Sequence, residues 1–327
     1  MFIPMPRPLL LLPLLALVLP ACSGGEEGES RVEVAQGVDL PAPVHLESEE
    51  LHNLIRIEQG MYSGALPAGE AAFAELAAMG IKTVIGVDGA DPDVELAAKY
   101  GLRYVHVPIG YDGVPEPAAN TLVRLVQEAE GPFYFHCHHG RHRGPAAAAV
   151  ALRAATGCSD ASARAVLEAA GTSTDYPGLW ADVAAWTMPA PGTELPELQE
   201  VARVDDFIAG MAAMDRDWDE LKALRAAGWV TPEDHPDLVL PRVAALFARH
   251  SIESAGSMSG EQIADVVLMD QMQAAVELAE LFQRQAEEAG LSPTEAHKRM
   301  LEETFRDLKA SCKDCHRDYR NPERDDR

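Results

Sequence analysis

Two thiols and an imidazole lie close together near the end of the sequence, in the segment Cys312-Lys313-Asp314-Cys315-His316. Two cysteines three positions apart share one face of a helix, where both can add to the vinyl groups of a haem. The histidine that follows can bind the iron as its proximal ligand. The segment therefore predicts one covalent c-type haem, held by Cys312 and Cys315 with His316 on the iron. The alternative is a redox or zinc dithiol beside an incidental histidine, which is disfavoured because no further zinc ligands lie nearby.

A second group of reactive side chains lies in the run His136-Cys137-His138-His139-Gly140-Arg141-His142-Arg143-Gly144. A strand is expected to end at Cys137, and an alanine-rich helix is expected to begin near Pro145. Such a loop turns its backbone N–H groups inward and, with the amino end of the helix, forms a cradle for an anion. The run resembles the His-Cys-x5-Arg loop of cysteine-dependent protein tyrosine and dual-specificity phosphatases.

This resemblance implies a role for each part of the loop. Cys137 would attack phosphorus as a thiolate that the helix end and nearby cations stabilise. Arg143 would hold two phosphate oxygens in its planar fork and stabilise the transition state. His136 would hold the cysteine strand in place. The residues between the cysteine and the arginine would bind the phosphate, namely His138, His139, Gly140, Arg141 and His142.

The four histidines of this run need an interpretation of their own. A metal site is one alternative, but a phosphate loop directs alternate side chains apart, which disfavours it. We expect the histidines instead to add positive charge around an anionic ligand. A sulfur-carrying loop of the rhodanese type is another alternative for the cysteine, although Gly140 together with Arg143 fits the phosphatase pattern better.

A phosphatase also needs an acid that protonates the leaving oxygen. Members of the family carry an aspartate on an earlier loop after a strand, and Asp112 takes that place here. Its rival is Asp88, which also follows a predicted strand. Both precede a glycine, so each can equally be a turn residue. Gly144 departs from the family, which usually has serine or threonine there, and it predicts slow hydrolysis of the phospho-cysteine.

The amino terminus predicts export. Residues 9–19 form an apolar stretch that is too short to span a bilayer and has the length of a signal-peptide core. It ends in Leu19-Pro20-Ala21-Cys22, which resembles a bacterial lipoprotein signal with Cys22 lipidated at the mature start. The alternative is a cleaved secretory signal in which Cys22 is incidental. We expect a periplasmic, membrane-anchored lipoprotein of a Gram-negative-type bacterium, in the compartment where c-type haem is attached.

The remaining sequence predicts a multidomain fold, with an α/β domain followed by an all-α domain. Short strands alternate with alanine-rich helices in the first half, which is typical of a mainly parallel sheet covered on both faces. The strands are expected at 81–87, 102–107 and 132–137, and the helices at 70–79, 117–130 and 145–155. Further on, helical patterns without a convincing strand favour an antiparallel four-helix bundle. The expected boundaries are 1–21 for the signal peptide, 22–50 for a flexible tether, 51–188 for the phosphatase-like domain, 189–196 for a linker, 197–321 for the bundle and 322–327 for a tail.

The carboxyl-terminal motif, with Tyr319 and Arg320 after it, resembles the signature of the cytochrome c′ and c-556 group. In that group the haem is attached to the last helix of a four-helix bundle. A methionine opposite His316 would raise the potential and favour electron transfer, whereas an open position favours small gases. Met211 falls roughly where this family has its distal residue, and the alternative for it is a core methionine that fills space.

These features together predict an exported phosphatase-like protein that hydrolyses a phosphomonoester or phosphoprotein through a phospho-cysteine. The haem domain would serve redox or gas sensing, or electron transfer. The alternative is a membrane-tethered electron-transfer cytochrome with a redox partner, whose first domain only binds an anion. The net charge of −25 disfavours nucleic acid as a partner.

Overall fold

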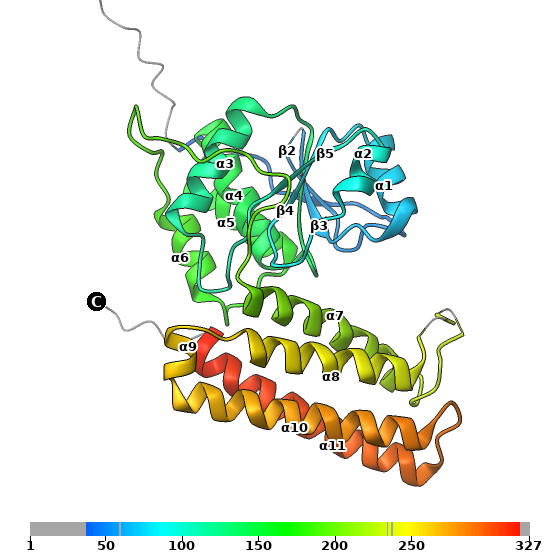
Figure 1. The fold of residues 1–327 in the computed structure, drawn as a ribbon. Helices are drawn as coiled ribbons and strands as arrows, with labels where there is room; N and C mark the ends of the chain where they lie inside the picture. Colours follow the sequence, from blue (N-terminus) through cyan, green and yellow to red (C-terminus); the bar gives the residue numbers. More distant parts are fainter. Residues whose placement is uncertain (1–36, 59, 234, 237, 321–327) are drawn as a thin grey trace, which may run out of the picture. The chain divides into compact units, whose positions relative to one another are not determined.

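The computed structural model describes residues 37–58, 60–233, 235–236 and 238–320 (Figure 1). The expected signal peptide, the expected lipidation site Cys22, the first part of the tether and the tail lie outside these residues. All the described residues belong to one compact unit.

A six-stranded mixed sheet organises the first part of the described chain. Its strands are Val44–His45 (β1), Ile55–Glu58 (β2), Met61–Ala65 (β3), Thr83–Gly86 (β4), Arg103–His106 (β5) and Phe133–Cys137 (β6). Their order in the sheet is β1-β2-β3-β6-β4-β5. The pairs β3–β6, β6–β4 and β4–β5 are parallel, whereas β1–β2 and β2–β3 are antiparallel.

The three predicted strands are confirmed as β4, β5 and β6. The strands β1, β2 and β3 were missed, and the antiparallel pairs of the sheet lie among them. β1 has only two residues, while charged or small residues interrupt the apolar ones in β2 (Ile-Arg-Ile-Glu) and β3 (Met-Tyr-Ser-Gly-Ala). None of the three therefore shows the apolar run that indicated the other strands.

Alternate residues of the strands build an apolar core on each face of the sheet, as the pleat requires. Ile85 and Phe135 pack on one face, with α3 (Glu116–Glu128), α4 (Arg143–Thr156), α5 (Asp160–Ala170) and α6 (Pro177–Ala185). Val84 and Tyr134 pack on the other face, with α1 (Gly69–Ala78) and α2 (Val94–Lys99). The prediction of a sheet covered on both faces is therefore confirmed. The helices α1, α3 and α4 were also predicted, whereas α2, α5 and α6 were not.

Residues 186–205 form neither helix nor strand, and they include the linker expected at 189–196. This segment contacts the edge of the sheet, where the backbone N–H of His106 donates to the carbonyl oxygen of Gln199 over 2.8 Å. The backbone N–H of Ala202 donates to Nδ1 of the same histidine over 3.3 Å. The chain therefore remains attached to the sheet well beyond the end of α6.

The rest of the described chain is helical and compatible with a helical bundle (Figure 1). Its long helices are α7 (Asp206–Ala226), α8 (Leu240–Ser257), α10 (Val266–Ala289) and α11 (Glu295–Cys315). Helix α7 packs on α8, α8 on α10, and α10 on α11. They share a core in which the Trp218 ring stacks on Phe305 with ring centres 4.2 Å apart. A five-residue π-helix, His316–Arg320, follows α11 directly.

The helical stretch between Ser259 and Ala289 is divided in two by Asp265. This residue ends the short α9 (Glu261–Ala264) and accepts hydrogen bonds from the backbone N–H groups of Val267 and Leu268, which begins α10. An aspartate cap of this kind is favoured at a helix start. Among the described residues, no helix combines the length and the apolarity that a membrane crossing requires.

Candidate functional site

The cysteine loop joins the end of β6 to the start of α4, as predicted. Cys137 is the last residue of the strand, and Arg143 is the first residue of the helix. Between them Gly140 has a φ of +65°, and a Cβ added there would overlap the backbone of Gly64 and Ala65 at the end of β3. Only glycine satisfies both conditions. The loop is therefore pressed against the neighbouring strand at its midpoint.

Polar side chains outside the loop hold its backbone in place, and the sequence analysis did not predict them. The amide of Asn53 donates to the carbonyl oxygens of Gly140 and Ala170 over 2.9 and 3.0 Å. The hydroxyl of Thr172 donates to the carbonyl oxygen of Arg141 over 2.6 Å. With two of its carbonyl groups held by these side chains, and one of them linked through Asn53 to the end of α5, the loop is preorganised before any ligand arrives.

The two predicted catalytic residues of the loop are both buried. Cys137 is 2% exposed and Arg143 is 8% exposed. The guanidinium of Arg143 donates to the hydroxyl of Tyr111 over 3.2 Å and lies 4.3 Å from the centre of that ring. Its Nε–H has no hydrogen-bond partner among the described residues. A buried N–H group without a partner is costly, and an anion bound in the loop would satisfy it.

Arg143 keeps its charge despite this burial. Burial acts to lower its pKa, but the nearby Tyr111, Cys137, Asp88 and Asp215 raise it more, so that the net shift is upward. A buried, permanently charged and partly unsatisfied guanidinium is suited to hold a phosphate group.

His136 is buried in the strand, and its Nε2 shares a short hydrogen bond with the hydroxyl of Tyr104. Burial lowers the pKa of His136 to about 4. Its neutral ring therefore fixes the strand that ends at Cys137, which is the role expected for it.

The prediction that the loop histidines add positive charge is wrong for most of them. Burial lowers the pKa of His142 to about 4, and the nearby His139 and Arg143 reinforce this shift. Burial also lowers the pKa of His139. Together with His136, these imidazoles are neutral at pH 7, because a partly dry site filled with other cations disfavours further protonation.

The two candidates for the general acid lie in different surroundings. Asp88 is 4% exposed, accepts a hydrogen bond from the backbone N–H of Ala90 over 3.1 Å, and acts electrostatically on Arg143. Asp112 is exposed in the segment between β5 and α3, directly after Tyr111, whose ring contacts Arg143. Asp112 is therefore open to solvent beside the loop, whereas Asp88 is enclosed.

An aromatic cluster lies beside the loop and was missed by the sequence analysis. The rings of Tyr111 and Tyr176 have centres 4.6 Å apart, and the ring of His142 lies 4.7 Å from that of Tyr176. Arg320, the last residue of the π-helix, donates to the hydroxyl of Tyr176 over 2.8 Å and lies 4.2 Å from the centre of the Tyr111 ring. The segment that follows the haem motif thus contacts the same tyrosine as Arg143.

The residues of the predicted haem motif lie partly buried at the end of α11. Burial raises the pKa of Cys312 to about 11 and lowers that of His316 to about 4. An imidazole that is neutral at pH 7 is the form that binds iron. Cys315 packs against an apolar cluster whose buried members are Met258, Leu268 and Met272, and against which Phe207 and Met211 also pack.

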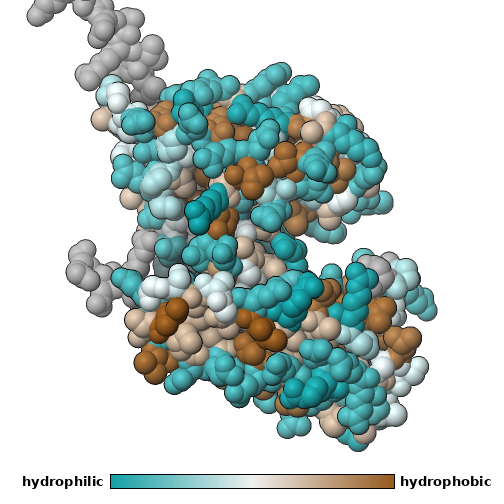
Figure 2. Space-filling model, in the orientation of Figure 1, coloured by the Kyte–Doolittle hydropathy of each residue, from teal (hydrophilic) through white to brown (hydrophobic). Residues whose placement is uncertain are grey.

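This arrangement fits a haem in two respects. Met211 of α7 packs against the same apolar cluster as Cys315. Large apolar side chains are also left exposed around the start of α10, where Ile263, Val266 and Val267 are 55 to 69% exposed. Apolar residues gather over α9 and the start of α10 in Figure 2. An apolar macrocycle attached beside them would cover such surface.

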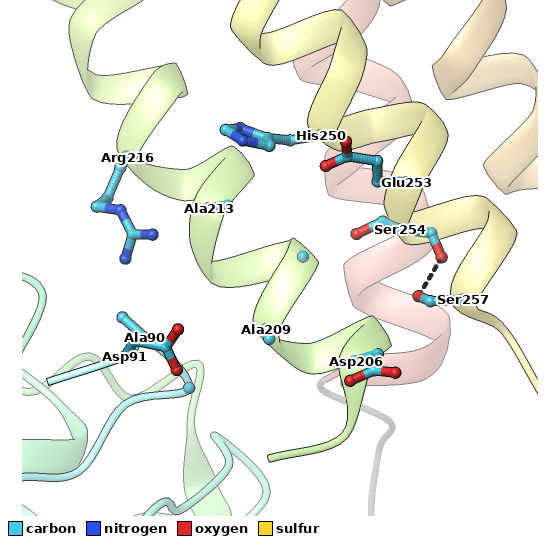
Figure 3. A pocket seen from close by; sticks show the side chains of 12 residues that line it. Ala90, Asp91, Asp206, Ala209, Ala213, Arg216, His250, Glu253, Ser254 and Ser257 are labelled. Carbon is cyan, nitrogen blue, oxygen red and sulfur yellow. Dashed lines mark hydrogen bonds between the residues drawn. The ribbon is translucent and has the colours of Figure 1, made fainter. Parts of the chain in front are cut away.

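A separate cavity of about 320 Å³ lies between the segment after β4 and the helices α7 and α8 (Figure 3). It is lined largely by small and polar residues, and Arg216, His250 and Glu253 stand at its wall in the close-up. Neither Cys137 nor the haem motif contributes to it. The cavity is therefore distinct from the cysteine loop.

Comparison with known proteins gives matches to solved structures alone. TpbA of P. aeruginosa is 26% identical, over 45% of this chain and 92% of that one, with a TM-score of 0.39. A cysteine-to-serine variant of TpbA in complex with pTyr is 23% identical, over 44% and 97%, with a TM-score of 0.35. Human DUSP28 is 21% identical, over 44% and 94%, with a TM-score of 0.33.

No protein-family model matches the sequence, and no curated protein matches it significantly. Because the TM-scores of these structures lie below 0.5, the function of the chain is argued from the geometry of its own loop.

Proposed function

We propose that the chain is a cysteine-dependent phosphatase that hydrolyses phosphomonoesters. The observation that carries this proposal is the buried pair at the two ends of the loop, Cys137 on β6 and Arg143 at the start of α4, with the Arg143 Nε–H left without a partner among the described residues. A module that only binds an anion has no need of a nucleophile at this position.

The reaction proceeds in two displacements on phosphorus. The thiolate of Cys137 attacks, an S–P bond forms, and the bond to the leaving oxygen breaks while Asp112 donates its proton to that oxygen. Arg143 and the inward N–H groups of the loop bind the equatorial oxygens as their charge develops. Water then attacks the phospho-cysteine while the carboxylate of Asp112 takes its proton, and the S–P bond breaks. Inorganic phosphate leaves, and the thiolate of Cys137 and the protonated Asp112 are restored.

The second displacement is expected to be slow because of Gly144. This residue offers no hydroxyl to the departing thiolate. A Cβ added at Gly144 would lie 3.1 Å from the backbone nitrogen of Cys137, so α4 approaches β6 closely at this point. The close approach accounts for a residue without a side chain at a position where the family usually has serine or threonine.

We further propose that the helical part is a cytochrome c′-like four-helix domain with one haem c. Cys312 and Cys315 would hold the haem through thioethers, His316 would bind the iron, and Met211 would take the opposite position. The group would supply one-electron redox chemistry or bind a small gas. An exported lipoprotein anchored at Cys22 in the periplasm would carry both activities in the compartment of haem attachment.

Contacts of Arg320 support coupling between the two activities. Arg320 lies four residues after His316 in the same π-helix, and both it and Arg143 lie close to the centre of the Tyr111 ring, at 4.2 and 4.3 Å. Arg320 therefore connects the helical turn of His316, the residue expected to hold the iron, with the tyrosine beside the phosphate loop. In this proposal the redox or ligation state of the haem alters how phosphate is bound.

The test of the phosphatase is hydrolysis of an aryl phosphate by haem-loaded protein that starts at Ser23, under reducing conditions. Cys137→Ser should abolish turnover. Cys158→Ser is the matched control, because Cys158 is also a buried thiol of the same domain, 3% exposed, and is not part of the loop. Turnover that survives in Cys137→Ser would contradict the proposal.

Gly144 favours a second candidate, a membrane-tethered cytochrome whose first domain binds an anion without turnover. The two are separated by measuring phosphate binding and hydrolysis on the same sample. Binding of inorganic phosphate without hydrolysis, with the haem intact, would establish the anion-binding module and make electron transfer to a redox partner the working function.

A further inference from the structure

Three side chains with metal-binding atoms converge beside the phosphate loop. They are His138 and His139 of the loop and Asp219 of α7, and one ligand atom from each lies within 4.8 Å of the others. The Nε2 atom of His138 lies 2.8 Å from Oδ2 of Asp219, and Nδ1 of His139 lies 3.6 Å from the same oxygen. This cluster joins the loop to the first long helix of the helical part.

The convergence of two neighbouring histidines is the informative feature. A phosphate loop was expected to direct alternate side chains apart, which argued against a metal site. Here two consecutive side chains converge, because His138 uses Nε2 and His139 uses Nδ1, and their ring centres lie only 4.5 Å apart. One histidine is enough to hydrogen-bond to Asp219. The second histidine brings another nitrogen atom close to the same oxygen, Oδ2, which a hydrogen bond alone does not require.

The separations suit a small tetrahedral cation. Two ligands that each lie about 2.1 Å from zinc are roughly 3.4 Å apart in a tetrahedral site, and the two nitrogen–oxygen distances lie on either side of that value. Only small shifts of the rings would place all three atoms on one ion. Two imidazoles and one carboxylate also make a ligand set that zinc uses with a water in its fourth position.

The neighbouring cation of the cluster lies on the far side of its carboxylate. Lys222 pairs with the other carboxylate oxygen, Oδ1, and leaves Oδ2 to the histidines.

We propose that His138, His139 and Asp219 bind one divalent transition-metal ion, with zinc as the ion that their chemistry favours. The side chains of the three residues are 18, 38 and 30% exposed, so an ion can enter from solvent and keep a water ligand. Bound there, the ion would tie the residue next to Cys137 to α7 and add positive charge beside the anion cradle. Lys222 competes for the same carboxylate and limits the affinity.

The test is calorimetric titration of untagged, haem-loaded protein with Zn²⁺, with metal content measured after dialysis. We expect one equivalent of zinc, and at least roughly tenfold weaker binding in His138→Ala and in Asp219→Asn. His142→Ala is the matched control, because it removes a histidine of the same loop that lies outside the cluster; its zinc content should not change. Absence of binding to the wild-type protein would overturn the proposal.

Two further variants test which side chains hold the ion. Cys137→Ser should retain its zinc; loss of the ion in that variant would mean that the thiolate binds it, against the proposal. Lys222→Ala removes the competing cation from a side chain that is 49% exposed, so the fold should tolerate it. This variant should bind zinc more tightly, and unchanged or weaker binding would contradict the assignment of Asp219 as a ligand. Neither result depends on phosphatase activity.

Discussion

Arg320 lies 4.2 Å from the centre of the Tyr111 ring, and Arg143 lies 4.3 Å from the centre of the same ring. Arg143 is the first residue of α4, the helix that follows the phosphate loop. Arg320 belongs to the π-helix that begins at His316. Each has a buried Nε–H without a hydrogen-bond partner among the described residues. Tyr111 is therefore positioned by two guanidinium groups that also favour a nearby anion.

The first prediction concerns Arg320→Ala. A cation–π contact of this kind contributes about 0.5–2 kcal/mol, so its loss should raise the KM for an aryl phosphate roughly two- to thirtyfold. The effect on kcat should be smaller, because Cys137 and Arg143 remain in place. Arg317→Ala is the matched control, since Arg317 belongs to the same π-helix but pairs with Asp314 and Asp318 on the surface. Equal KM values in both variants would exclude this role.

The sequence predicted the parts of this site that are close in the chain. Cys137 and Arg143 are joined by five residues between a strand and a helix, so the loop itself brings them together. Tyr111 lies 32 residues from Arg143, and Tyr176 lies 144 residues from Arg320. Contacts between residues so far apart in the chain depend on how the helices pack on the sheet. The spacing of residues in the sequence does not predict that packing.

The same distinction explains the missed strands and the general acid. The strands β4 and β6 are apolar runs long enough to show in the sequence, whereas β1 has two residues and takes its place through pairing with β2. Asp112 and Asp88 could be ranked only by analogy, because both precede glycine after a strand. Burial separates them, and burial follows from the tertiary fold.

The second prediction concerns the midpoint of the loop. Gly140→Ala should lower the free energy of unfolding by at least about 2 kcal/mol, because it combines a positive φ with overlap against Gly64 and Ala65. Gly80→Ala is the control, since Gly80 has a φ of +81° but nothing within 4 Å of an added Cβ. It should lose only about 1 kcal/mol. Urea unfolding of both variants, followed by circular dichroism, measures the difference.

The third prediction concerns stability at acid pH. His136 has a pKa of about 4 in the folded protein against 6.5 as its ordinary value, so between these values the unfolded chain binds a proton that the folded chain does not. Its contribution is therefore complete above about pH 6.5 and is lost as the pH falls toward 4, by up to about 3 kcal/mol. Urea unfolding at about pH 7.5 and about pH 5 should reveal the loss.

The matched variants for this prediction are His136→Gln and His52→Gln. The glutamine at 136 does not titrate, so the pH dependence of its unfolding should be flatter than that of the wild type, although its stability near neutral pH falls with the loss of the bond to Tyr104. His52 is exposed, so its replacement should leave the pH dependence unchanged. An equally steep loss in His136→Gln would assign the acid sensitivity to other groups.

The fourth prediction concerns the proposed distal ligand. Met211→Leu should lower the reduction potential of the haem, on the order of 100 mV, because a thioether ligand stabilises the reduced iron. Met214→Leu is the control, one turn later on α7 and 8% exposed in the helical core. Spectroelectrochemical titration and the visible spectrum of the oxidised protein measure the change. Identical spectra for the two variants would leave Met211 as a core residue and the iron open to gases.

The fifth prediction concerns the second displacement. Gly144→Ser adds a hydroxyl that can assist departure of the Cys137 thiolate, so steady-state turnover should rise at least roughly tenfold, as expected of a positioned proton donor. The wild-type protein should show a rapid burst of one equivalent of phenolate followed by slow turnover. In the variant the two phases should no longer differ in rate. Its added Cβ meets the backbone of β6 at 3.1 Å, so α4 must first shift by a few tenths of an ångström.

Gly144→Ala separates the hydroxyl from this steric effect, because it adds the Cβ alone. If alanine and serine slow the reaction equally, the close approach of α4 to β6 controls the site and the missing hydroxyl does not. If serine accelerates turnover and alanine does not, the slow step is hydrolysis of the phospho-cysteine. The domain would then be a phosphatase held at low turnover by one absent side chain, and the contact of Arg320 with Tyr111 would act on phosphate binding ahead of that step.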